Sequence, residues 1–196
     1  MCIRDSWDAE GREYLDFLTG ISVNNLGHCH PRITAAIREQ AGTICHTTNL
    51  YYIPRQIQLA ELLVRNSFAD CAFFCNSGAH ANEAAIKITR RHAALNRRTE
   101  HPEIISMTGS FHGRTIATLS AAGPGKHTQG FEPLVKGFTR VPFNDLDQVH
   151  KQVNNNTVGI IIEPVQGEGG IHVAKTDFLK GLRQICDEHH LFFLLD

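Results

Sequence analysis

The sequence predicts an α/β fold built on a mostly parallel β-sheet with helices on both faces. From residue 71 onward, short apolar runs alternate with longer segments of helical period, the pattern of strands joined by crossover helices. The apolar runs, such as residues 158–162 (VGIII), lack polar alternation, as expected for strands buried on both faces. Polar or glycine-rich segments follow several runs, and parallel strands bring such segments to one edge of the sheet.

Fewer helices and strands are predicted for the N-terminal part of the chain. Residues 10–11 are expected to form a turn, followed by a short strand at residues 14–17. One helix is expected over residues 31–40, because it begins at a proline and its apolar residues share one face. A second apolar-periodic helix is expected over residues 55–65.

The alternating part predicts five strands and three long helices. The strands are expected at residues 71–75, 103–107, 139–141, 158–162 and 191–195. The helices are expected at residues 79–97, 144–153 and 176–189, with Asn144 and either Thr176 or Asp177 as N-caps. Residues 108–138 form the longest irregular stretch, broken by a short helix near residues 115–119, and long loops in compact α/β domains are usually functional.

Composition excludes several function classes. The 196 residues carry 19 Lys and Arg against 20 Asp and Glu, so the net charge of −1 favours no nucleic-acid partner. No apolar run approaches the roughly 20 residues of a membrane span. The first residues lack the apolar core of a secretory signal, so we expect a cytoplasmic protein without membrane or nucleic-acid partners.

The cysteines and histidines do not indicate a metal site. The six cysteines form no Cys-x-x-Cys pair and are interpreted as reduced thiols, with Cys71 and Cys75 in the core. The close histidine pairs, residues 28 and 30 and residues 189 and 190, lack the partners of a zinc site. We therefore expect no bound metal.

A candidate anion site lies at residues 76–79 (NSGA), between a predicted strand and a predicted helix. Small residues at a helix N-terminus leave backbone N–H groups free, and the helix dipole favours a phosphate there. Ser77 adds a hydroxyl donor. The alternative is an ordinary N-cap serine with nothing bound.

Four further residues follow predicted strands. The Phe111 ring suits stacking on a planar cofactor, with an ordinary loop anchor as the alternative. The Arg114 fork suits a substrate carboxylate, with a structural ion pair or a solvated charge as the alternative. Glu168 lies in a glycine-rich turn and is either a substrate contact or simply part of that turn. Asp196, at a strand tip, can bind a protonated ring nitrogen, as in pyridoxal phosphate enzymes.

Seven motifs, in order along the chain, resemble those of class III pyridoxal phosphate-dependent aminotransferases. They are residues 11–17 (GREYLDF), 26–31 (LGHCHP), 74–79 (FCNSGA), 82–87 (NEAAIK), 109–115 (GSFHGRT), 141–146 (VPFNDL) and 163–170 (EPVQGEGG). The resemblance covers residues 7–196 and implies fold type I. Pyridoxal 5'-phosphate is the cofactor it implies.

The resemblance assigns cofactor-binding roles to six residues. Ser77, Gly78 and Ala79 are implied to hold the phosphate. Phe111 is implied to pack on the pyridine face with His112 beside it. Asp196 is implied to pair with the pyridinium nitrogen.

The resemblance also assigns substrate-binding roles. Arg114 is implied to bind the α-carboxylate, and Glu168 to act as the glutamate that sorts substrate amines. Tyr52 falls where related enzymes place a substrate-contacting aromatic residue. The acylornithine branch of the family is favoured by Arg114 and by residues 130–134 (GFEPL).

The implied reaction exchanges an amino group between N2-acetylornithine and 2-oxoglutarate in arginine biosynthesis, by a cytoplasmic homodimer. Succinylornithine, ornithine and 4-aminobutyrate aminotransferases share most of the motifs and stay open as alternatives. A nucleotide-binding domain is a further alternative, but it rests on fold analogy only.

Two departures from the family pattern are expected to matter. His80 stands where the family usually has Glu, which changes the charge near the implied phosphate site. None of the six lysines occupies the motif of the Schiff-base lysine, so we expect a truncated chain that is inactive alone. A non-catalytic truncated fragment is the alternative from another class.

The expected domain organisation follows from the same resemblance. Residues 1–6 are interpreted as an artefact or scar, because they join the first motif abruptly. Residues 7–50 are expected to belong to the small domain and its connection. Residues 51–196 are expected to form the first, incomplete part of the cofactor-binding large domain.

Overall fold

The computed structural model describes residues 5–96, 99–125 and 127–196. Contacts between residues divide the chain into a first unit, residues 1–72, and a second unit, residues 73–196. The expected division at residue 50 concerns the domains of the complete family fold and stays a prediction.

The first unit begins with a two-stranded antiparallel ribbon. Strand β1 (Asp5–Trp7) pairs with β2 (Glu13–Leu15) across a turn in which Gly11 has a φ of +79°. The expected turn and strand are thereby confirmed to within one or two residues. Residues 1–4, with Cys2, lie outside the described residues, and the interpretation of residues 1–6 as a scar stays a prediction.

A left-handed turn follows at α1 (Thr19–Ser22), where all four residues have positive φ. Such backbone costs about 1–2 kcal/mol per residue other than glycine, so the neighbouring contacts must compensate. Asp16 supplies them: its Oδ1 accepts from the N–H groups of Leu18 (3.0 Å) and Thr19 (2.8 Å). Its Oδ2 lies 2.7 Å from His28 Nε2.

The two predicted helices of the first unit are confirmed. Helix α2 (Pro31–Thr43) and helix α3 (Pro54–Arg65) both begin at a proline, whose fixed φ suits the first helical position. Neither helix contains a buried residue, so their apolar side chains stay in contact with solvent within the described chain.

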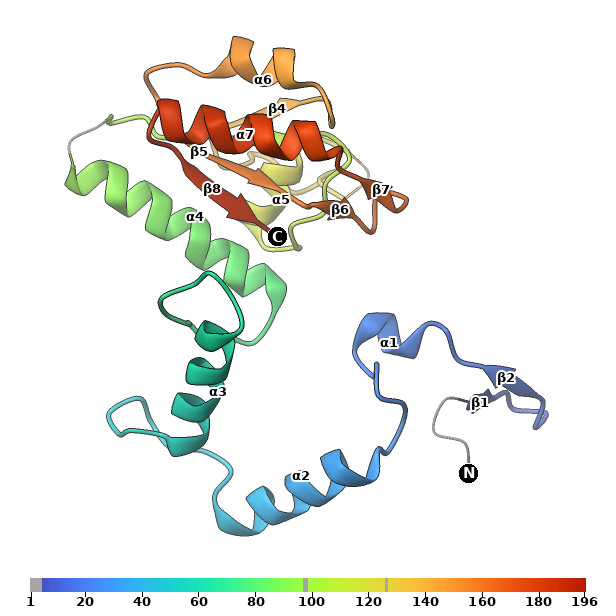
Figure 1. Ribbon diagram of the computed structural model, residues 1–196. Coiled ribbons are helices and arrows are strands. Elements are labelled where there is room, and N and C mark those ends of the chain that lie inside the picture. The colour runs from blue at the N-terminus through green and yellow to red at the C-terminus, as the bar shows by residue number, and fades with distance from the viewer. Residues whose placement is uncertain (1–4, 97–98, 126) are drawn as a thin grey trace. The chain divides into compact units, whose positions relative to one another are not determined.

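The second unit is built on a four-stranded parallel sheet, as predicted (Figure 1). Its strands, in spatial order, are β4 (Phe138–Val141), β3 (Glu103–Met107), β5 (Thr157–Ile162) and β8 (Phe192–Leu195). All three pairings are parallel. The central strand β5 is buried along its whole length, which explains its lack of polar alternation.

Helices cover both faces of this sheet, again as predicted (Figure 1). On one face, α4 (Gly78–Leu95) and α5 (Ile116–Ala122) pack around Ile104 and Ile161. On the other face, α6 (Leu146–Gln152) and α7 (Thr176–Glu188) pack around Ile105 and Ile160. A short hairpin, β6 (Val165–Gln166) with β7 (His172–Val173), extends beyond β5.

Several sequence predictions in this region were wrong. Residues 71–75 form no strand, and Cys71 and Cys75 are exposed rather than in the core, because no described strand pairs with this segment. Asp145, not Asn144, caps α6 by accepting from Gln148 N–H (3.0 Å).

Asn144 instead adopts a left-handed φ of +65°, and its Oδ1 accepts from Lys175 N–H (2.8 Å). Lys175 is itself the N-cap residue of α7, in place of the expected Thr176 or Asp177. The helix boundaries therefore shift by a residue or two without changing the order of the elements.

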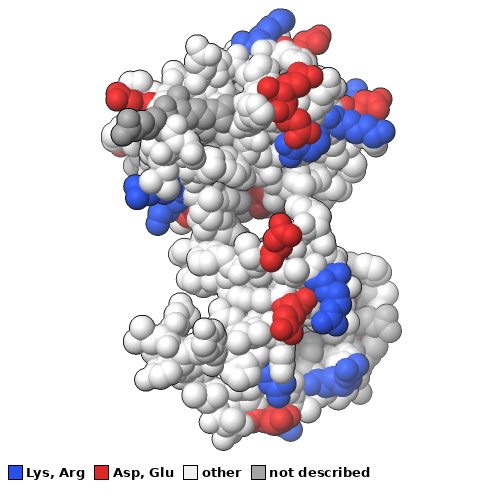
Figure 2. Space-filling model, turned by 60° about the vertical axis from the view of Figure 1, so that its left-hand side comes forward, with Lys and Arg blue, Asp and Glu red and all other residues white. Residues whose placement is uncertain are grey.

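The surface carries both signs of charge. On the face shown in Figure 2, Lys and Arg side chains lie beside Asp and Glu side chains in several places, in keeping with the net charge of −1. Within the described residues, no helix combines the length and the apolar character that crossing a membrane requires.

Candidate active site

The carboxyl ends of β3, β5 and β8 bring three chain segments to one edge of the sheet. The segment after β5 starts with Glu163, a buried residue whose Oε1 accepts from Phe111 N–H (2.7 Å) in the segment after β3. The last strand, β8, ends next to Asp196, whose N–H donates to Ile162 O (2.9 Å). This edge is where open parallel sheets bind ligands.

A buried histidine holds the carboxylate of Asp196. His112 is 1% exposed, and its Nδ1 lies 2.7 Å from Asp196 Oδ2. The backbone of His112 is held in turn, because Asn82 Nδ2 on α4 donates to His112 O (2.9 Å). His112 Nε2 is buried and has no hydrogen-bond partner among the described residues.

The first turn of α4 packs against the loop that carries His112. Gly113 has a φ of +121°, and a Cβ there would lie only 2.6 Å from Ala79 Cβ. Only glycine allows this approach, so the loop and the first turn of α4 form one continuous surface. The predicted cofactor residues Ser77, Gly78, Ala79, His112 and Asp196 are thereby connected.

The N-terminus of α4 retains the features of an anion site. Ser77 is the N-cap, and its Oγ accepts from His80 N–H (3.3 Å). The same Oγ lies 2.8 Å from His80 Nδ1, so the histidine that replaces the family's usual Glu binds the cap hydroxyl. Ser77 and Gly78 are exposed, which leaves the helix N-terminus open to an anion.

Phe111 and Arg114 lie near each other on the same loop. The Arg114 guanidinium carbon is 5.9 Å from the centre of the Phe111 ring, within the range of a cation–π contact. Arg114 is exposed and has no ion-pair partner among the described residues. The structural ion pair considered for Arg114 is therefore not formed among these residues, and the solvated charge stays open beside the substrate contact.

Glu168 and Tyr52 have fewer contacts. Glu168 is exposed in the turn of the β6–β7 hairpin, which packs on the loop after β3. Tyr52 belongs to the first unit, where its side chain is 93% exposed. Its role as a substrate contact stays a prediction.

Further polar residues at this edge had no role predicted from the sequence. Asn82 is a buried polar residue on the sheet-facing side of α4, and it belongs to one of the family motifs. Gln166 is 2% exposed and donates to Thr108 O (3.0 Å). Asn82 occupies a position of α4 where the helical period predicts an apolar residue, and that mismatch was the signal in the sequence for a buried polar role.

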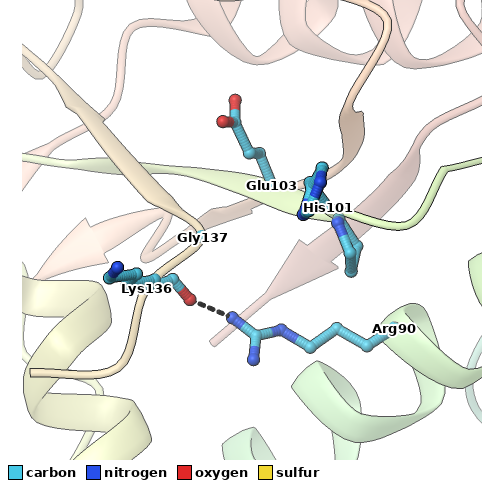
Figure 3. A pocket seen from close by; sticks show the side chains of 6 residues that line it. Arg90, His101, Glu103, Lys136 and Gly137 are labelled. Atoms are coloured by element: carbon cyan, nitrogen blue, oxygen red, sulfur yellow. Dashed lines mark hydrogen bonds between the residues drawn. The ribbon is translucent and has the colours of Figure 1, made fainter.

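A separate hollow of about 280 Å³ lies at the opposite edge of the sheet (Figure 3). Its side chains do not converge on one point: the Glu103 carboxylate and the Lys136 side chain point away from Arg90. Arg90 Nη2 donates to Lys136 O (2.6 Å), and burial lowers the pKa of this guanidinium, partly opposed by Glu83. Arg90 therefore joins α4 to the chain before β4, and the chemistry-bearing residues lie elsewhere.

The sequence profile of the class-III aminotransferase family matches residues 5–196. The chain belongs to the class-III aminotransferase family. Among similar proteins is the acetylornithine aminotransferase of Methanocaldococcus jannaschii, which is 52% identical over 97% of this chain and 48% of its own length. The acetylornithine aminotransferase of Myxococcus xanthus is 50% identical over 97% of this chain and 47% of its own length.

Solved structures of the family share the fold. The ornithine aminotransferase of Toxoplasma gondii, solved with partial occupancy of PLP, matches with a TM-score of 0.93 at 29% identity, over 98% of this chain and 46% of its own. N-acetylornithine aminotransferase from Stenotrophomonas maltophilia matches with a TM-score of 0.82 at 39% identity, over 98% of this chain and 48% of its own. The predicted fold class is confirmed, and the chain spans about half the length of the curated relatives it matches.

Proposed function

We propose that this protein is a pyridoxal phosphate-dependent aminotransferase that exchanges an amino group between N2-acetylornithine and 2-oxoglutarate. One observation carries the proposal: the loop at Gly113 joins the His112–Asp196 pair to the open N-terminus of α4. The acetylornithine aminotransferases that are about half identical to the chain support the choice of substrate. Ornithine aminotransferase structures match at 29–30% identity, which makes ornithine the weaker candidate.

The residues at this sheet edge fit pyridoxal phosphate. The exposed first turn of α4 offers free N–H groups and the positive end of a helix dipole to a phosphate. The Phe111 ring offers a face for stacking, and the Asp196 carboxylate offers an acceptor for a protonated ring nitrogen. The buried Nε2 of His112, which has no hydrogen-bond partner in the described part of the chain, leaves one further polar atom for the same site.

When bound, pyridoxal phosphate supplies an electron sink that stabilises negative charge on the substrate carbon. In this proposal Asp196 keeps the proton on the ring nitrogen, which preserves that electron demand. His112 orients the Asp196 carboxylate, and Asn82 holds His112 in place. His80 replaces the family's usual Glu and is hydrogen-bonded to the Ser77 hydroxyl. In this proposal a bound phosphate competes with His80 for that hydroxyl.

The substrate contacts extend the same surface. Arg114 is exposed and presents a fork that can bind a substrate carboxylate through two parallel hydrogen bonds. Glu168, on the neighbouring hairpin, is proposed to discriminate between substrate amines by its negative charge. We also propose a cytoplasmic homodimer that serves arginine biosynthesis, as the family resemblance implies.

A substrate panel tests the proposed reaction. The complete protein encoded by the source gene is purified with pyridoxal phosphate, and its rates with acetylornithine, succinylornithine, ornithine and 4-aminobutyrate are compared. We expect the highest kcat/KM with acetylornithine. A higher value with 4-aminobutyrate would overturn the substrate assignment, and no turnover with any donor would overturn the reaction.

The 196-residue chain serves as a separate comparison in that assay. Among the described residues that meet at the sheet edge none is a lysine, and the family reaction depends on one. We therefore expect no turnover by these 196 residues alone, free of host enzymes. Turnover by the isolated chain would contradict the expectation that it is a non-catalytic piece.

Replacing Asp196 tests the mechanism. Asp196→Ala removes a charged hydrogen bond worth about 1.5–3 kcal/mol, or about 10- to 150-fold in kcat. Asp187→Ala is the matched control, because this exposed aspartate on α7 forms its ion pair with Arg183 one helical turn away. Equal activities of the two variants in the complete protein would exclude the proposed role of Asp196.

A further inference from the structure

Gln166 connects the two loops on which the proposed substrate contacts lie. This residue ends β6, immediately before the turn that holds Glu168, and it is only 2% exposed. Its Nε2 donates to Thr108 O (3.0 Å), in the loop that continues to Phe111 and Arg114. A single buried amide therefore bridges the hairpin and the loop.

The backbones of the hairpin and the loop also approach each other closely. A Cβ at Gly169 would lie 2.4 Å from Gly109 O, closer than any side chain tolerates. Gly109 has a φ of +78°, and a Cβ there would lie 3.2 Å from Gln166 Oε1. The tip of the hairpin consequently rests directly on the loop, and a side chain at position 169 would displace it.

The loop is held at a second point by the same chain segment. Glu163, three residues before Gln166, accepts from Phe111 N–H (2.7 Å). The base of the hairpin is closed by Ala174 N–H, which donates to Pro164 O (2.9 Å). Glu168 itself makes no hydrogen bond within the described part of the chain. Its position therefore depends on the contacts that Gln166, Gly169 and Glu163 make with the loop.

We propose that Gln166 is a positioning residue that sets the amine selectivity of the enzyme by fixing Glu168 relative to Arg114. This inference rests on the proposed function. Acetylornithine and ornithine differ at the α-nitrogen, which is a neutral amide in one and a charged amine in the other. The Glu168 carboxylate can discriminate between the neutral amide and the charged amine only while its distance from the substrate carboxylate bound at Arg114 is fixed.

The test removes the amide without removing volume. In the complete protein, Gln166→Met should lower the ratio of kcat/KM for acetylornithine to that for ornithine by about 2- to 12-fold, the factor of one neutral hydrogen bond. Gly169→Ala, which pushes the hairpin away from Gly109 O in the same loop, should change the same ratio. Gln184→Met is the matched control, because the side chain of exposed Gln184 donates to Glu188 on its own helix.

Hydrogen exchange gives a second readout that does not require activity. The amides of residues 167–171 should exchange faster in Gln166→Met than in the wild type, while those of β3 and β5 stay protected. Unchanged selectivity in both Gln166→Met and Gly169→Ala would overturn the positioning role, and so would unchanged exchange in Gln166→Met. A wild-type protein without transaminase activity would instead overturn the proposed function, and exchange would still report whether Gln166 holds the hairpin.

Discussion

The two units of the chain differ in where their apolar side chains lie. In the second unit, Ile104, Ile105 and Ile160 are fully buried between the sheet and its helices. In the first unit, Ile37 on α2 is 63% exposed and Leu62 on α3 is 55% exposed. Apolar side chains therefore form a packed core in the second unit, whereas in the first unit they leave apolar helix faces exposed within the described chain.

This difference shows which contacts stabilise each unit. Burial of apolar surface is the dominant favourable term in folding, so the second unit owes its stability to the clusters on the two faces of its sheet. The described helices of the first unit gain little stabilisation from burial of apolar surface. Their starts are set by prolines, and α1 is held by the hydrogen bonds of Asp16.

The largest expected effect comes from truncating a core side chain. Ile160→Ala in β5 should lower the free energy of unfolding by about 2–5 kcal/mol, because it leaves a cavity between the sheet and α7. Ile37→Ala on α2 should change it by less than about 0.5 kcal/mol. Urea unfolding followed by circular dichroism measures both, and similar losses in the two variants would abolish the contrast between the units.

Thiol reactivity should distinguish a buried cysteine of the second unit from the exposed cysteines of the chain. Burial raises the pKa of Cys186 on α7 to about 11, from an ordinary value of 9.0, and nearby Arg183 only partly offsets it. At pH 8 its thiolate should be about 100-fold scarcer than that of an ordinary thiol, and access is blocked as well. The exposed cysteines are Cys29, Cys45, Cys71 and Cys75.

Mass spectrometry after brief alkylation of the 196-residue chain measures these rates. The four exposed cysteines should be modified at least about 100-fold faster than Cys186. The same reaction in urea is the control, since unfolding should make all of them alike. Slow modification of Cys71 and Cys75 in the native chain would restore the sequence-based assignment of both to the core.

The smallest expected effect is local and concerns the left-handed turn of the first unit. The Thr19 N–H and, after it, His28 lower the pKa of Asp16 below its ordinary value of 3.8. A carboxyl whose pKa is lowered on folding stabilises the turn fully above the ordinary value, and this contribution is lost as the pH falls through the lowered value. The Leu18 and Thr19 amide resonances should therefore shift as the solution is acidified below about pH 3.8.

Asp16→Asn is the control for this titration. Its amide oxygen can still accept from Leu18 and Thr19, but it does not titrate, so the acid-dependent shift of those two resonances should disappear. A shift that persists unchanged in Asp16→Asn would assign the effect to another group. NMR spectra of the two proteins between pH 2 and 6 decide the question.

Much of the fold was determined by the sequence alone. Apolar runs identified β3, β4, β5 and β8 to within one or two residues, because strands buried on both faces carry no polar alternation. A proline located the start of α2, since proline is favoured at the first helical position, and apolar periodicity located α3 to within one residue of its start. The rule that ligands bind at the carboxyl edge of a parallel sheet pointed to the segments after β3 and β5 and to Asp196.

Other features were decided only by the tertiary structure. Residues 71–75 are as apolar as a strand, but strand formation needs a neighbouring strand, and none of the described strands pairs with them. The hydrogen bonds from His112 to Asp196, from Asn82 to His112 and from Gln166 to Thr108 join residues that are 30 to 84 positions apart. Local patterns report which residues are polar or buried, whereas the partner of a buried polar group depends on how distant segments meet.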